Sequence, residues 1–401
     1  MALTPLHDAL AQMLALVQPV AAVDCELTAA AGRVLRADVR ALCDVPPWDN
    51  SAMDGYALST SDLAQSDVLP VSQRIAAGAA PARLTPGTAA RIFTGAPVPA
   101  GADAVVMQEN ARLDDDGLHL LQAAIAGEHI RRRAQDVAEG QLMLEQGRRL
   151  SAADVGLVAS VGISHLSVAR RPKIALISTG DELADPGSEL RPGQIYNSNR
   201  PMLQALFSQW GCEVVDGGIV GDSYDATRQR LSELAADCDW LVSTGGVSVG
   251  EEDHVKAAVE SLGELLLWKL AIKPGKPVAF GRVGGSYFMG LPGNPSSSFV
   301  TALMVLRPLL LRFQGLAQCL PREYQGVSEF DWPNAGKRQE FVRVRLNLQS
   351  EALPGLEAYP NQSSGVLSSA SWADALAVIE VGSAFEKGAR LPYLLLSELL
   401  N

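Results

Sequence analysis

The hydrophobic positions between residues 171 and 313 alternate between short apolar runs and longer helical stretches. Apolar runs lie at 173–178, 213–215 and 240–243, and helical periodicity appears at 200–210, at 225–236 and from about 253. Strands that alternate with helices predict a parallel sheet covered by helices on both faces. In such sheets ligands bind beyond the carboxyl ends of the strands, so the loops after these runs are the first candidates for chemistry.

The regions on either side lack this alternation. Residues 5–18 repeat apolar positions on one helical face. Residues 45–138 combine short runs, such as 104–107, with frequent Gly and Pro turn signals and predict a small β-rich domain. Residues 321–401 predict a separate small β domain.

Length and composition narrow the class of protein. A chain of 401 residues is expected to form about two to four domains. A net charge of -12 argues against nucleic-acid binding, so any site for an anion must be a local cluster of Lys and Arg. The most apolar stretch, 299–313, contains Arg307 and Pro308 and predicts a buried helix rather than a membrane span. Five scattered cysteines without a CxxC pair, and no visible targeting segment, predict a cytoplasmic protein.

A glycine-rich loop, residues 243–253, follows the third apolar run. Glycines after a strand let backbone N–H groups approach a ligand, and the next helix begins at the same place, which suits a phosphate. The same pattern also fits a tight turn capped by Asp253. The sequence supports both interpretations about equally.

Acidic residues follow two other apolar runs. Asp181 and Glu182 come after the first run and Asp222 after Ile219-Val220. Such carboxylates can hold Mg²⁺ with waters, although each alone is more often a helix cap or a solvated charge. Their occurrence at neighbouring strand ends favours a metal site.

Two further segments suggest anion binding. Lys269, Lys273 and Lys276 fall within eight residues of apolar surroundings, and in a single strand Lys269 and Lys273 would share a face. They would suit a small oxyanion, although an edge strand protected by lysines is the alternative. In 290–298, prolines and glycines precede serines that begin a helix, which gives either a second anion site or an N-cap. Together these features predict chemistry on a phosphate-bearing ligand without identifying it.

Long segments of the chain resemble the molybdopterin molybdenumtransferase family, which includes the bacterial MoeA enzymes and the C-terminal domain of gephyrin. The most specific are Asp49-Asn50-Ser51-Ala52-Met53-Asp54-Gly55-Tyr56-Ala57 and Ile92-Phe93-Thr94-Gly95-Ala96-Pro97-Val98-Pro99. The segments 243–253, 268–277 and 290–297 are also similar nearly letter for letter. The resemblance runs from about residue 5 to the C-terminal region.

The resemblance implies an elongated α/β plus β subunit with a central three-layer α/β molybdopterin-binding domain, a β-rich domain and a C-terminal β-barrel-like domain. The implied domains are 1–22 with 170–320 (α/β), 23–44 with 139–169 (linker), 45–138 (β-rich) and 321–401 (C-terminal β). The implied reaction inserts molybdate into adenylylated molybdopterin, with Mg²⁺-dependent hydrolysis and release of AMP. A homodimer is implied as well. The resemblance further suggests the molybdopterin adenylyltransferase and apo-molybdoenzymes as protein partners. Binding to nucleic acid or to membranes is not expected.

Functional residues carry over by position. The implied catalytic residues are Asp253, Asp222, Glu182, Lys269 and Lys273. The implied metal ligands are Asp181, Glu182, Asp222 and Asp253. The implied substrate-binding residues are Asp54, Thr94, Asp136, Thr244, Gly245, Gly246, Ser248, Lys276, Pro277, Pro292, Asn294, Ser297, Arg343 and Ser364. Of these, Lys273, Lys276, Ser297, Arg343 and Ser364 would hold molybdate.

The chain departs from the family pattern at three positions. Ala134 and Gln135 stand where Gly-Glu is usual, and Ser296 stands where Val is usual. Three other functions remain alternatives: a molybdopterin adenylyltransferase, a non-catalytic scaffold and a general nucleotide-binding protein. Neither the preference between molybdate and tungstate nor the apo-enzyme that receives the cofactor follows from the sequence.

Overall fold

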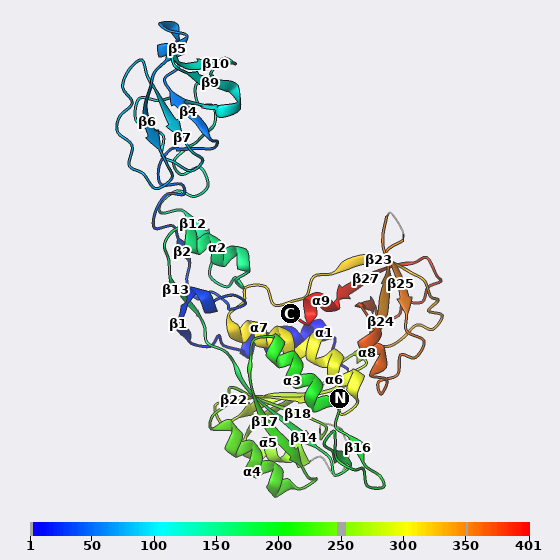
Figure 1. The fold of residues 1–401 in the computed structure, drawn as a ribbon. Coiled ribbons are helices and arrows are strands. Elements are labelled where there is room, and N and C mark those ends of the chain that lie inside the picture. The colour runs from blue at the N-terminus through cyan, green and yellow to red at the C-terminus, as the bar shows by residue number, and fades with distance from the viewer. Residues whose placement is uncertain (1–2, 247–253, 350–351) are drawn as a thin grey trace. The chain divides into compact units, whose positions relative to one another are not determined.

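The computed structural model describes residues 3–246, 254–349 and 352–401 (Figure 1). The chain divides into two compact units. The larger unit comprises Met1–Val23, Gly32–Arg36 and Val168–Asn401, and the smaller unit comprises Asp24–Ala31 and Ala37–Ser167.

A six-stranded mixed sheet forms the centre of the larger unit. In spatial order its strands are β17 (Glu213–Val220), β14 (Lys173–Thr179), β18 (Trp240–Thr244), β22 (Ser286–Leu291), β21 (Pro277–Val283) and β19 (Gly263–Lys269). The first four strands run parallel, and β21 and β19 are antiparallel to their neighbours. The three predicted apolar runs are therefore strands of one sheet.

Helices cover both faces of this sheet because successive strand residues point to opposite sides. Ile174 and Leu176 pack into one hydrophobic cluster, whereas Ala175 and Ile177 pack into the other. The first face carries α1 (Leu6–Leu16), α3 (Asn199–Gln209), α6 (Pro295–Thr301), the π-helical segment η4 (Ala302–Leu306) and α7 (Arg307–Gln314). The second face carries α4 (Tyr224–Ala235) and α5 (His254–Leu262).

The apolar helix Pro295–Gln314, built from α6, η4 and α7, is long and apolar enough to span a membrane. Of its most apolar window, however, 89% lies buried inside the structure. It therefore has the character of a core helix, as the sequence of residues 299–313 predicted.

A closed barrel follows in the C-terminal part of the larger unit. Its strands, in order, are β24 (Gln339–Asn347), β25 (Gly355–Ala358), β23 (Tyr324–Ser328), β27 (Arg390–Leu395) and β26 (Ala375–Ile379), and β26 pairs back with β24. Its interior is apolar, with Val342, Val344 and Leu356 among the buried side chains. A two-residue strand, β20 (Ile272–Lys273), adds to β24 from outside the ring.

The lysine segment is consequently not one strand. β19 ends at Lys269, and β20 belongs to a different sheet. Between the two strands, the N–H of Ala271 donates to the carbonyl of Thr4 at 2.7 Å, and Lys269 accepts from the N–H of Thr4 at 2.8 Å. The expectation that Lys269 and Lys273 share a strand face was wrong, because the chain turns from one sheet into the other between them.

The smaller unit is rich in short strands, as predicted for residues 45–138. One sheet has the order β6 (Val71–Ile75), β7 (Ala89–Ile92), β4 (Gly55–Leu58) and β8 (Ala104–Met107). A second has the order β5 (Val68–Leu69), β10 (Gly117–Leu120) and β9 (Ala111–Asp114). Two further pairs join β11 (Ile130–Arg131) to β3 (Asn50–Ser51) and β12 (Leu142–Leu144) to β2 (Val39–Arg40), and α2 (Ala152–Ser160) follows them in the chain.

The other α-helices and strands of the described chain, most of them in the larger unit, are β1 (Ala22–Glu26), β13 (His165–Ala169), β15 (Leu183–Ala184), β16 (Ile195–Tyr196), α8 (Ser368–Trp372) and α9 (Leu396–Leu399).

The predicted fold class is confirmed. A central three-layer α/β part, a β-rich part and a C-terminal barrel are all present. The finer division into four domains stays a prediction.

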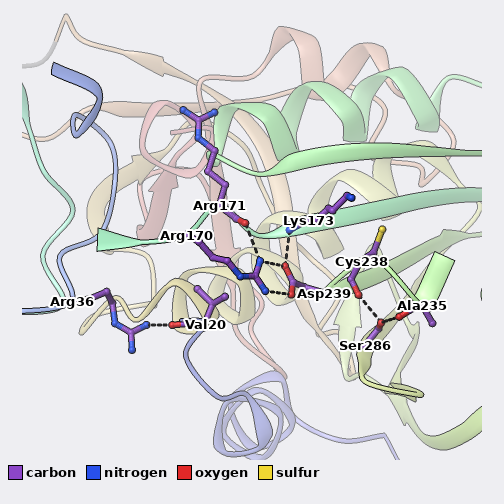
Figure 2. Close-up of polar contacts among 9 residues, drawn as sticks. All are labelled: Val20, Arg36, Arg170, Arg171, Lys173, Ala235, Cys238, Asp239 and Ser286. Atoms are coloured by element: carbon purple, nitrogen blue, oxygen red, sulfur yellow. Dashed lines mark hydrogen bonds and ion pairs between the residues drawn. The ribbon is translucent and has the colours of Figure 1, made fainter. Parts of the chain in front are cut away.

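Asp239 ties together the amino-terminal ends of the central strands (Figure 2). Its carboxylate accepts two hydrogen bonds from the Arg170 guanidinium, one of them at 2.6 Å between Nη1 and Oδ2. It also accepts the backbone N–H of Lys173 at 2.8 Å. The backbone carbonyl of Asp239 accepts the N–H of Tyr287 at 2.9 Å. One residue therefore connects β14, β18 and β22 at the edge opposite their carboxyl ends.

We expect Asp239→Asn to lower the free energy of unfolding by about 2 kcal/mol, because it leaves a partly buried guanidinium without its charged acceptor. Urea denaturation measures this loss. The matched control is Asp237→Asn, whose carboxylate is 77% exposed and pairs with the Lys173 ammonium at the surface. Its loss should stay below about 0.5 kcal/mol, and equal losses in the two variants would contradict the role given to Asp239.

Candidate active site

The carboxyl ends of the four parallel strands lie in register. Thr179 at the end of β14 pairs with Val220 of β17, and Thr244 at the end of β18 pairs with Leu291 of β22. The loops that follow these strands therefore begin side by side. Because Ala279 of β21 pairs with Gly290 of β22, Pro277 also lies at this edge. The structure thus brings together the acidic loops, the start of the glycine-rich loop, the 290–298 loop and the end of the lysine segment.

Glycine is required where the glycine-rich loop leaves β18. Gly245 and Gly246 have positive φ angles of 86° and 61°. A Cβ on Gly245 would lie 2.9 Å from the carbonyl oxygen of Thr179, so the backbones approach too closely for a side chain. Ser248 and Asp253, predicted to bind substrate and metal, lie outside the described residues.

Asp181 and Asp222 hold each other's loops. The N–H of Asp222 donates to Oδ1 of Asp181 at 3.1 Å, and the N–H of Asp181 donates to Oδ2 of Asp222 at 3.4 Å. The Glu182 carboxylate lies against Gly180, where an added Cβ would be 2.3 Å from its Oε2. Residues 3–246, 254–349 and 352–401 contain no group of three or more side chains placed to hold a metal. Two carboxylates that each offer a second oxygen nevertheless suit Mg²⁺, which keeps several waters in protein sites.

The three lysines differ in their surroundings. Lys276 is exposed, Lys269 is half-buried, and Lys273 forms an ion pair with Glu340, 3.0 Å between Nζ and Oε2. The Glu340 side chain is only 11% exposed, against 45% for Lys273. Sequence reasoning missed Glu340. The available signal was an acidic residue in the segment 336–343, three positions before Arg343.

The 290–298 loop docks on the segment that contains Ser364. Asn294 Nδ2 donates to Ser364 Oγ at 3.1 Å, and the N–H of Ser296 donates to the Ser364 carbonyl at 3.0 Å. The hydroxyl of Ser296, which is fully buried, donates to the carbonyl of Val366 at 2.7 Å. Ser296 therefore joins α6 to this segment, which accounts for a polar residue where Val is usual. Ser297 is next to it and 4% exposed.

Arg343 is a buried cation whose hydrogen-bond acceptors among the described residues are all neutral. Its side chain is 1% exposed and donates to Ser369 Oγ, the Phe341 carbonyl and the Ser363 carbonyl at 3.0–3.3 Å. Within the described chain, no carboxylate forms an ion pair with it. Burial lowers the pKa of Arg343 to about 10, and the charge of Glu340 opposes this shift. Because this pKa lies below that of the unfolded chain, the buried charge costs stability at every pH below about 10. A bound anion would remove that cost.

In the smaller unit, Asp54 and Thr94 form a direct contact. Asp54 Oδ1 accepts both the N–H and the hydroxyl of Thr94, each at 2.7 Å. The backbone hydrogen bond from Thr94 is the largest cause that holds the pKa of Asp54 below its usual value, and the hydroxyl hydrogen bond adds to it. Asp136 follows the turn at residues 132–135, and its N–H donates to the Val45 carbonyl at 3.0 Å.

Arg91 stands beside the Asp54–Thr94 contact and was not predicted from the sequence. Its guanidinium donates to the Gly55 carbonyl at 3.1 Å and to Gln108 Oε1 at 2.6 Å. It also lies over the rings of Tyr56 and Phe93, 5.1 and 4.8 Å from their centroids. The available signal was its position immediately before the segment 92–99 and two residues before Phe93.

Similar proteins identify the family. The chain is 40% identical to a molybdopterin molybdenumtransferase of Haemophilus influenzae, and the match covers 79% of this chain and 79% of the relative. It is 37% identical to one from Nostoc over 90% of this chain and 85% of the relative. The chain belongs to the MoeA family of molybdopterin molybdenumtransferases.

The MoeA family models match nearly the whole chain. They are the MoeA N-terminal region (domains I and II) at residues 4–162, a probable molybdopterin binding domain at 175–312 and the MoeA C-terminal region (domain IV) at 325–396. A molybdopterin biosynthesis MoeA protein from Pyrococcus horikoshii has a similar structure, with a TM-score of 0.82, 29% identity and coverage of 98% of this chain and 99% of that one. The predicted family and enzyme class are confirmed.

Ala134, which stands where the MoeA family usually has glycine, strains the backbone of this chain. Ala134 has a φ of 58°, in the left-handed region that favours glycine. The turn is closed by Gln135, whose N–H donates to the Arg132 carbonyl at 3.1 Å and whose Oε1 accepts the Arg132 N–H at 3.0 Å. Gln135 therefore has a structural role that a glutamate could also fill.

We expect Ala134→Gly to raise the free energy of unfolding of the smaller unit by about 0.5–1 kcal/mol. The released strain, about 1–2 kcal/mol, exceeds the added entropy of glycine in the unfolded chain. Urea denaturation followed by a probe in the smaller unit measures the change. Ala138→Gly, four residues on and without a positive φ, is the control and should be destabilising. A loss of stability in Ala134→Gly would show that this turn is not strained.

Proposed function

We propose that the protein is a molybdopterin molybdenumtransferase that inserts molybdate into adenylylated molybdopterin, hydrolyses the adenylate in a Mg²⁺-dependent step and releases AMP. The product would be the molybdenum cofactor. The observation that carries the proposal is the aligned carboxyl edge of β14, β17, β18 and β22. There, acids, glycine turns and lysines from separate parts of a MoeA chain gather at one edge.

The acidic and glycine-rich loops would act on the phosphoanhydride. Thr244, Gly245 and Gly246, with Ser248, would hold phosphate through backbone N–H and hydroxyl groups. Pro277, Pro292 and Asn294 would contact the substrate on the other side of the phosphate from these glycines. Asp181, Glu182, Asp222 and Asp253 would hold Mg²⁺, which neutralises charge on the phosphates when bound.

The oxyanion seat comprises Lys273, Lys276, Ser297, Arg343 and Ser364. Three cations and two hydroxyls suit a small tetrahedral dianion. The buried Arg343, whose acceptors in the described part of the chain are neutral, supports an anionic ligand at this place. Lys269, at the end of β19, would contact the phosphate or the pterin, close to the seat.

Residues of the smaller unit are also proposed to bind substrate. Asp54, fixed by Thr94, and Asp136 are the proposed contacts. We further propose a cytoplasmic homodimer that exchanges ligands with the molybdopterin adenylyltransferase and with apo-molybdoenzymes. The five cysteines are scattered along the sequence without a CxxC pair, which supports a reducing compartment.

AMP release from adenylylated molybdopterin in Mg²⁺, with and without molybdate, tests the activity. We expect molybdate to stimulate release by the wild-type chain. Asp222→Asn should lose at least tenfold in kcat because one proposed metal ligand is neutralised, and Lys276→Gln should mainly raise the KM for molybdate. Lys256→Gln, on the exposed side of α5, is the charge-matched control. A substrate that is held but never cleaved would leave only a binding or scaffold role.

Molybdate should also stabilise the folded protein through Arg343. At a concentration one hundred times Kd, a ligand adds about 2.7 kcal/mol to the free energy of unfolding. We expect a rise in Tm for the wild-type chain and a much smaller rise for Arg343→Lys, which keeps the charge but loses the planar fork of donors. An unchanged response in Arg343→Lys would remove Arg343 from the seat.

A further inference from the structure

A carboxylate lies inside the proposed oxyanion seat. β20 pairs with β24 in parallel, and this register sets Lys273 opposite Glu340. The side chains meet at 3.0 Å between Nζ and Oε2, and the Glu340 side chain is 11% exposed. An acid beside a site for a dianion opposes binding, so its presence requires a reason.

Glu340 also bears on Arg343, the buried cation of the same seat. Arg343 has no ion pair among the described residues, and its three hydrogen-bond acceptors there are neutral. The charge of Glu340 partly offsets the effect of burial on the pKa of Arg343. One carboxylate therefore acts on two of the three cations of the seat.

The charge balance of the seat follows from these contacts. Lys273, Lys276 and Arg343 are cationic, and Glu340 is anionic. Three cations and one carboxylate leave a net charge of about two, equal and opposite to that of a tetrahedral dianion such as molybdate. Without Glu340, the seat would be more positive than its ligand requires, and it would hold the ligand too tightly to pass it on.

We propose that Glu340 is a positioning and selectivity residue, a built-in counter-ion that holds Lys273 and adjusts the oxyanion seat to a doubly charged ligand bound weakly enough for transfer. The inference rests on the proposed function, because it assumes that these cations bind the oxyanion. The rival explanation is purely structural, with the Lys273–Glu340 pair serving only to join β20 to β24. The two explanations differ in sign: a counter-ion weakens anion binding, whereas a structural pair supports the seat.

Calorimetric titration with two anions of the same shape separates the explanations. Molybdate is a tetrahedral dianion and perrhenate a tetrahedral monoanion. We expect Glu340→Gln to bind molybdate at least fivefold more tightly than the wild-type chain, and perrhenate about twofold more tightly, since the electrostatic gain scales with ligand charge. In turnover, both the KM for molybdate and kcat should fall, because the oxyanion is held more firmly.

Two variants provide controls. Glu380→Gln also removes one carboxylate, from the hydrogen bond with Gln339 at the neighbouring position of β24, 2.9 Å between Gln339 Nε2 and Glu380 Oε1. It should leave both affinities unchanged. Glu340→Asp keeps the charge and should retain the wild-type preference between the two anions even if its Tm falls.

Each outcome decides the question. Equal or weaker binding of both anions by Glu340→Gln, with the wild-type chain still binding molybdate, would overturn the role of Glu340 and leave the proposed function intact. An equal gain for both anions would also overturn it, because charge would then not be the cause. Failure of every variant and of the wild-type chain to bind molybdate would remove the oxyanion seat itself and the inference with it.

Discussion

The site depends on the backbone hydrogen bonds that hold four parallel strands in register. Parallel pairing fixes which residues stand side by side, so the positions of Thr179, Val220, Thr244 and Leu291 also fix where the next residues start. Loops from distant parts of the chain are thereby delivered to one edge, where Asp181 and Asp222 join two of them by hydrogen bonds. At the opposite edge, the hydrogen bonds of Asp239 stabilise the same arrangement, so fold stability and site geometry share a cause.

This arrangement could be predicted from the sequence because buried parallel strands are continuous apolar runs followed by punctuation. Residues 173–178 and 240–243 are each followed by Thr-Gly, and Asp181 and Asp222 follow strands that proved to be neighbours. The turn at residues 244–246 was equally visible in the sequence. Two glycines directly after a strand predict a place where the backbone approaches another group too closely for a side chain. The family resemblance then supplied the ligand, which these patterns alone do not specify.

The contacts between the lysine segment and the barrel strand β24 could not be predicted in this way. Lys273 and Glu340 belong to segments with no common periodicity, and their pairing follows from β20 joining β24, a two-residue strand too short to leave a pattern. The same short strand explains why the lysine segment was wrongly expected to be continuous. The family resemblance implied a substrate-binding role for Arg343, but only the closed barrel shows that its charge is buried. Such features arise from tertiary placement rather than from local preference.

The addition of β20 to the barrel has a consequence for how the chain can change over evolutionary time. The barrel has its own apolar interior, as an exchangeable module would. Yet its strand β24 carries Glu340 and Arg343, and the lysine loop of the central sheet is hydrogen-bonded to that strand. Any substitution that shifts β24 by one residue would turn a different side chain toward Lys273. The two parts must therefore vary together, and recombination between relatives at residues 314–323 would have to preserve this single register.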